Sequence, residues 1–162
     1  MTTDKRSSLD LLKVVHEDAG GLAQIFGGRI PEYINSLWTG VALALGDGPL
    51  EYFDGSVSNE VGGLGADLVF YSTHAVIRAT ANPSQAARVW TFRRSDLQTV
   101  GVSGGIGFFG DDAFGSWPGR VAITATYPTE QVTLPASETD SASRRRLLDF
   151  LPSLLADLNC GK

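Results

Sequence analysis

Seven short segments between residues 50 and 134 have a composition typical of β-strands, and their close spacing constrains the fold more than any other feature. Each is rich in Val, Ile, Thr, Tyr, Phe or Trp and is bounded by Gly, Pro, Asn, Asp or Ser. Parallel strands need helical crossovers, for which this region has no room. The sequence therefore predicts antiparallel strands at residues 50–57, 66–72, 75–81, 88–94, 99–103, 120–127 and 130–134.

Amphipathic helices are predicted on both sides of these strands. Residues 31–45 begin with a proline, which suits a first helical position, and then repeat apolar residues at three- and four-residue steps. Residues 138–158 form a leucine-rich helix, and Pro152 inside it predicts a kink or a break near residues 149–151. A further helix is predicted at residues 7–19. We expect a single domain, with a helical N-terminal extension over residues 1–48 and the strands and C-terminal helix over residues 49–162.

Composition excludes several classes of protein. Of the 162 residues, 43% are apolar and 19% are charged, as in a folded globular domain. The net charge of −5 argues against nucleic acid as a partner, and no apolar run is long enough to span a membrane. One cysteine and two histidines predict neither a disulfide framework nor a metal site. The polar N-terminus resembles no signal peptide, so the cytoplasm is the expected compartment, and no cofactor is expected.

Two catalytic motifs occur without the context that their chemistry needs. Residues 101–105 match G-x-S-x-G around Ser103, but both histidines precede this serine and no helix is predicted directly after it. A triad of His74, Asp96 and Ser103 in another order is the remaining possibility for a serine hydrolase. Residues 105–110 match G-x-G-x-x-G, yet two aspartates follow at once and would repel a phosphate. We therefore expect a protein that is not an enzyme, with no catalytic residue assigned.

Three segments resemble the bacterial members of the pleckstrin-homology-like superfold, including GRAM-like domains. Residues 67–79 are similar to the apolar strand, Ser/Thr turn and apolar strand of these domains. Residues 89–100 resemble the next strand pair, and residues 120–158 resemble the closing hairpin and helix. The resemblance covers about residues 50–158 and implies an α+β fold. Its expected form is a seven-stranded antiparallel barrel, one open end of which is plugged by the C-terminal helix.

Aromatic residues supply the first candidate binding surface. The glycine-rich segment 104–119 contains four large aromatic side chains, which either fold back as a lid on the core or dock into a partner. The helix at 31–45 also carries aromatic residues, and it either packs on the strands or forms an oligomeric interface. The candidate partner-binding residues are Phe108, Phe109, Phe114, Trp117, Tyr33 and Trp38.

Arginines supply the second candidate surface. They come from neighbouring predicted strands and from the start of the last helix, where they form either an ordinary charged face or a patch for anionic lipid. The candidate anion- or lipid-binding residues are Arg78, Arg93, Arg94, Arg144 and Arg145.

The sequence thus predicts a binding module or adaptor that recognises a protein partner or associates with its own copies. The open strand edges of such a domain are able to accept a partner strand. A peripheral domain that binds anionic lipid is the alternative prediction, and a small serine hydrolase built on Ser103 is the second alternative.

Overall fold

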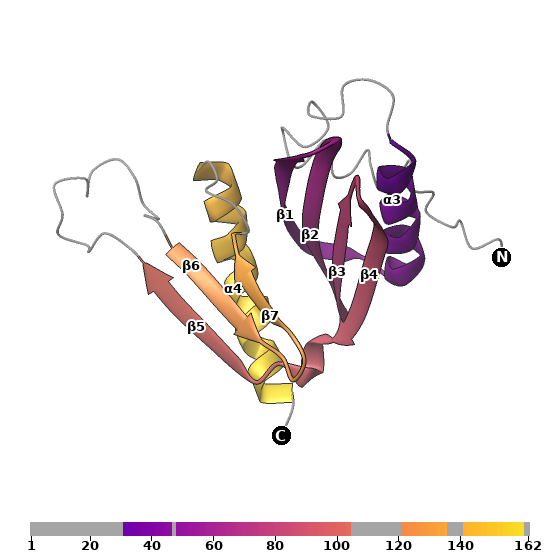
Figure 1. Cartoon of the computed structure of the whole chain (residues 1–162). Coiled ribbons are helices and arrows are strands. Elements are labelled where there is room, and N and C mark those ends of the chain that lie inside the picture. The colour runs from indigo at the N-terminus through magenta and orange to yellow at the C-terminus, as the bar shows by residue number, and fades with distance from the viewer. Residues whose placement is uncertain (1–30, 47, 105–120, 136–140, 161–162) are drawn as a thin grey trace, which may run out of the picture. The chain divides into compact units, whose positions relative to one another are not determined.

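The structure is a computed structural model that describes residues 31–46, 48–104, 121–135 and 141–160. The chain divides between Phe92 and Arg93 into two compact units, and the described part of each contains its own antiparallel sheet and one α-helix (Figure 1). The two units are described separately.

The first unit is a four-stranded sheet with a helix packed on one face. Helix α3 spans Glu32–Leu45 and is followed by β1 (Leu50–Glu60), β2 (Gly63–Ser72), β3 (Ala75–Asn82) and β4 (Gln85–Arg93). The strands lie side by side in chain order, because each is joined to the next by a short turn. Part of the expected N-terminal extension therefore shares a core with the strands that follow it.

The core of this unit lies between α3 and alternate residues of the strands. Phe53, Phe70 and Ile77 are paired across β1, β2 and β3, so they lie in one row on the same face of the sheet. The Trp38 ring meets Phe70 edge-on at 6.1 Å between centroids. The apolar stripe predicted for residues 31–45 is thus the buried face of α3. It comprises Ile34, Leu37, Trp38, Val41 and Leu45.

A tight turn joins β1 to β2 and explains why both strands are longer than the sequence predicts. Gly62 and Gly63 have φ angles of +94° and +156°, in the region that favours glycine. A Cβ at Gly63 would lie 2.7 Å from the Tyr33 hydroxyl. The polar and glycine-rich residues 58–65 resemble a loop in composition, yet they extend the β1–β2 hairpin to Glu60 and Gly63.

The second unit is a three-stranded sheet with the C-terminal helix. A 3₁₀ helix, η1 (Arg94–Asp96), leads into β5 (Thr99–Gly104), β6 (Val121–Thr126), β7 (Gln131–Leu134) and α4 (Ser141–Cys160). The order in the sheet is β5-β6-β7. The predicted hairpin over residues 120–134 is confirmed, and the Tyr127 N–H donates to the Glu130 carbonyl at 2.8 Å to close its turn.

Several expectations are confirmed and two are corrected. All seven predicted strands are present in an α+β fold. They do not close into one barrel within the described residues, because β1–β4 form one sheet and β5–β7 pair in a separate one. Helix α4 runs without a break through Pro152, since a proline removes a single helical hydrogen bond and the buried residues Leu147, Phe150 and Leu154 span that position. The alternative of a kink there stays a prediction. The predicted helix at 7–19 and most of segment 104–119 lie outside the described residues.

Candidate functional site

Among the described strands, four lie at the edges of the two sheets, and three of these carry features that discourage pairing with another chain. β1 has a register irregularity between Leu50 and Tyr52 and contains several acidic residues. β4 places two arginines along its length. β7 has four residues and is followed directly by Pro135. Charges, irregular pairing, short length and proline are the devices by which natural proteins protect sheet edges.

β5 is the edge strand without these features. Its sequence, Thr-Val-Gly-Val-Ser-Gly, contains no charged residue and no proline, and its pairing with β6 is regular from Thr99 to Gly104. Among the described strands its only neighbour is β6. The backbone groups on its other side therefore have no strand partner within this part of the chain, which makes β5 the candidate binding edge.

An apolar face of the second sheet extends to this edge. Val102 is paired with Ile123, and Ile123 is paired with Leu134, so the three residues form one row across β5, β6 and β7. Ile123 and Leu134 are fully buried, whereas the side chain of Val102 is 60% exposed. The row therefore runs from the core of the unit out to an exposed valine on β5.

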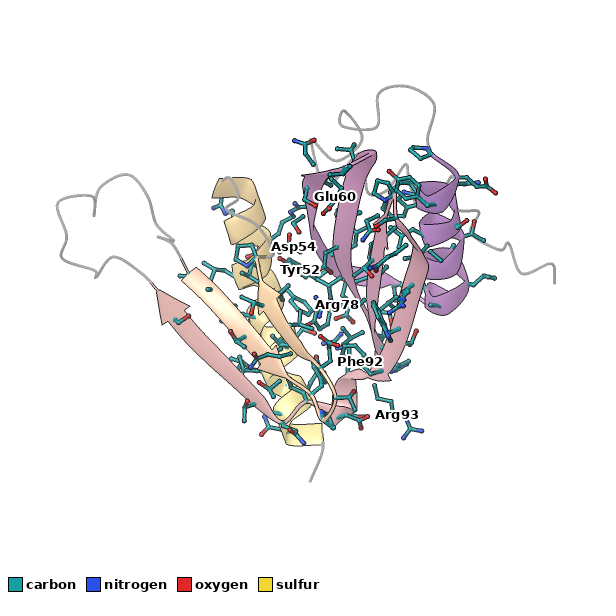
Figure 2. All side chains as sticks on the ribbon, viewed as in Figure 1. Tyr52, Asp54, Glu60, Arg78, Phe92 and Arg93 are labelled. Carbon is teal, nitrogen blue, oxygen red and sulfur yellow. The ribbon has the colours of Figure 1, made fainter. Side chains whose placement is uncertain are left out.

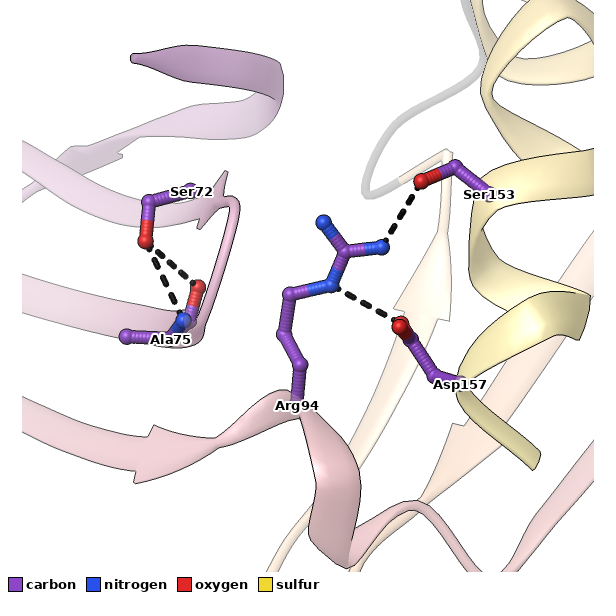
Figure 3. A network of polar contacts seen from close by, with 5 residues as sticks. All are labelled: Ser72, Ala75, Arg94, Ser153 and Asp157. Carbon is purple, nitrogen blue, oxygen red and sulfur yellow. Dashed lines mark hydrogen bonds and ion pairs between the residues drawn. The ribbon is translucent and has the colours of Figure 1, made fainter. Parts of the chain in front are cut away.

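A buried ion pair holds the chain in place just before β5. Arg94 in η1 is 3% exposed, and its Nε donates to Asp157 Oδ2 of α4 at 2.8 Å (Figure 3). The same guanidinium donates to Ser153 Oγ at 2.9 Å and lies 5.5 Å from the centre of the Phe150 ring. Because this cluster joins η1 to α4, β5 begins from a fixed point.

The predicted arginine patch divides into arginines with described ionic partners and arginines that are exposed. Arg78 forms two hydrogen bonds with the Asp67 carboxylate, at 3.2 and 2.9 Å. Arg94 is buried, so its charge is not presented to solvent. Arg93 and Arg145 are exposed, and the side chain of Arg144 is not described. Lipid binding by these residues stays a prediction.

The aromatic candidates of α3 serve the fold of the first unit. The Tyr33 hydroxyl donates to the Leu64 carbonyl at 3.0 Å and accepts from the Leu64 N–H at 3.2 Å. Trp38 is 1% exposed. Of the two alternatives for this helix, packing on the strands is the one that the structure shows, and neither residue enters our candidate site. The remaining aromatic candidates lie outside the described residues: Phe108, Phe109, Phe114 and Trp117.

The sheet face of the first unit away from α3 carries polar groups that contact one another. Figure 2 labels Tyr52, Asp54 and Arg78, which come from β1 and β3. The Tyr52 hydroxyl donates to Asp54 Oδ2 at 3.4 Å, and the Gly55 N–H donates to Asp54 Oδ1 at 2.7 Å. These contacts orient the Asp54 carboxylate on β1.

The residues considered for a serine hydrolase are not brought together by the second unit. Ser103 is exposed near the end of β5, and Asp96 lies in η1, before the start of that strand. Strand residues rise about 3.3 Å each, so the two side chains stand at opposite ends of β5. His74 is an exposed residue between β2 and β3 in the first unit. Within the described residues no group of three His, Cys, Asp or Glu side chains is placed to hold a metal ion.

The sequence predicts that an open strand edge accepts a partner strand, but it does not indicate that this edge is β5. The available signal is the absence of charge from residues 99–104, in a chain whose other edge strands carry charges or end at a proline. That signal becomes informative only when the sheet order shows which strands lie at an edge.

Comparison with known proteins leaves the family of this chain open. No protein-family model matches it, and no curated protein sequence matches it. Among solved structures, the hSac2 domain from the human phosphoinositide phosphatase Sac2 aligns over 94% of this chain and 83% of that one. The identity is 12% and the TM-score is 0.41. In the part of the chain that the structure describes, no helix combines the length and apolar character needed to cross a membrane.

Proposed function

We propose that this protein is a non-enzymatic binding module that accepts an extended strand along β5. One observation carries the proposal: among the four edges of the described sheets, only β5 is free of charged residues, proline and irregular pairing and is longer than four residues. An added strand would pair its backbone N–H and C=O groups with those of β5, while alternate side chains would provide specificity.

The chemistry of β5 defines the strand that would suit it. A partner residue next to Val102 would cover an apolar side chain that is 60% exposed, so an aliphatic or aromatic residue fits there. The opposite face of β5 presents Thr99 and Ser103, which favour small polar neighbours. The partner is therefore an uncharged segment of about six residues with alternating apolar and hydroxyl side chains.

We also propose that the fold is similar to the pleckstrin-homology-like superfold. The order of strands and helix along the chain supports this proposal. Seven antiparallel strands precede one C-terminal helix, which is the element order that the sequence resemblance implies. Binding of anionic lipid is not added as a second function, because Arg78 and Arg94 are each bonded to a carboxylate.

Selection of peptides tests strand addition directly. A displayed library of random ten-residue peptides would be enriched on the immobilised full chain and on its Val102→Lys variant, which places a charge on the edge. Val61→Lys is the matched control, because Val61 is 99% exposed in the β1–β2 turn and lies in the other unit.

We expect peptides with alternating apolar residues to be captured by the wild-type chain and by Val61→Lys, and to be lost with Val102→Lys. Failure to enrich any peptide, or equal capture by Val102→Lys, would contradict binding at β5.

A further inference from the structure

The sequence of β5 is nearly symmetric about its central glycine. Thr99 and Ser103 are hydroxyl residues at equal distance from Gly101, and Val100 and Val102 flank it directly. Antiparallel strands run in opposite directions. Because the residue types on the two sides of Gly101 are alike, an antiparallel copy of β5 places similar residue types opposite each other. We infer that the strand that pairs with β5 is the β5 strand of a second copy of this chain. This inference rests on the proposed strand addition.

Pairing around a twofold axis at Gly101 matches every side chain with a compatible one. Gly101 would lie opposite the Gly101 of the second copy, and Val100 opposite Val102, twice. Thr99 would lie opposite Ser103, also twice. β-branched pairs and hydroxyl pairs stabilise antiparallel strands, whereas like charges directly opposite destabilise them. The contact is isologous, so it closes at two copies and joins two three-stranded sheets into one.

The apolar row of the second sheet gives this pairing its driving force. Val102 continues the row of Ile123 and Leu134 but is 60% exposed. In the paired register, the Val100 of the second copy would cover it. Two copies with a net charge of −5 repel each other at long range. Contact through the uncharged strand β5 brings no like charges directly opposite each other.

The register allows a sharp test by cysteine substitution in the full chain, with Cys160→Ser as the background. Directly opposed residues have Cα atoms about 4.5–5.5 Å apart, within the range for a disulfide. Gly101→Cys would therefore form a cross-linked dimer under mild oxidation. Ser103→Cys is the matched control, because each residue 103 would face residue 99 of the other copy. A Cβ at Gly101 meets nothing closer than Thr124 at 3.9 Å, so this substitution has room.

Sedimentation equilibrium over a concentration series measures the association itself. We expect the wild-type chain and the conservative variant Val102→Thr to approach twice the monomer mass of 17.2 kDa as concentration rises. Val102→Lys should weaken the dimer by about tenfold or more, and Val61→Lys should not.

A wild-type chain that stays monomeric, or equal cross-linking of Gly101→Cys and Ser103→Cys, would overturn self-pairing. If peptide capture at β5 persists in that case, only the identity of the partner is refuted. A dimer that is unaffected by Val102→Lys would place self-association elsewhere on the chain, and peptide capture would then decide strand addition separately.

Discussion

Replacement of Arg94 tests whether the cluster before β5 stabilises the second unit. The substitution Arg94→Met keeps a long apolar stem but removes the guanidinium that bonds Asp157 and Ser153. The side chains of Arg94 and Asp157 are 4% and 15% exposed, so water can form few of the hydrogen bonds that the variant loses. Removing one member of a buried pair costs about 3–5 kcal/mol, because the other charge is left without compensation.

The partial exposure of Asp157 places the expected loss near the lower end of that range, at about 3 kcal/mol. Loss of the contact with the Phe150 ring adds roughly 1 kcal/mol. The double variant Arg94→Met/Asp157→Leu removes both charges and should recover most of the loss, because a well-packed apolar pair replaces a buried ion pair at little net cost.

Urea denaturation followed by far-UV circular dichroism gives the free energies of unfolding for the wild-type chain, the single variants Arg94→Met and Asp157→Leu, and the double variant. The coupling energy from this cycle should be roughly 2–3 kcal/mol. A loss below about 1 kcal/mol for Arg94→Met, or a double variant as unstable as the single ones, would refute the reasoning.

Two further predictions follow from single contacts, and a third follows from the absence of charge from β5. Tyr33→Phe should lower the free energy of unfolding by about 1–3 kcal/mol in a urea titration, because the Leu64 N–H and carbonyl both lose their hydrogen bond to the hydroxyl. The control Thr39→Val removes an exposed helical hydroxyl and should change the free energy of unfolding little. Gly55→Ala should cost about 1–3 kcal/mol, since its Cβ would collide with Leu68, whereas Gly101→Ala should be nearly neutral in dilute solution. Peptide capture should change less than about twofold between ~50 and ~500 mM salt, and a steep fall would indicate charged contacts instead.

Local patterns in the sequence predicted the helices and strands of the described residues, though not the full length of every strand. Alternation and turn residues located all seven strands, and the stripe through Ile34, Trp38 and Val41 identified the buried face of α3. The prediction was wrong where tertiary pairing decides the outcome. The composition of residues 58–65 suggests a loop, but the turn at Gly62 brings these residues into register as strand. Closure into a barrel depends on which distant strands pair with one another, and here β1–β4 and β5–β7 form separate sheets.

The candidate site depended on sheet order more than on residue type. The sequence predicts charged and aromatic side chains as binding residues, yet Arg94 and Trp38 are both buried. The residues of β5 are small and uncharged, and their importance comes from their place at a sheet edge. Strand order arises from contacts between segments that are distant in sequence, so a pattern within one segment does not reveal it.

Amide hydrogen–deuterium exchange along residues 99–104 tests most directly whether β5 is the binding edge. Backbone groups on an unpaired edge exchange quickly, and they become protected when another strand pairs with them. In the wild-type chain, exchange of these amides should slow as protein concentration rises, and this change should be absent in Val102→Lys. Unchanged exchange in β5, together with slowing at another surface, would contradict strand addition at this edge.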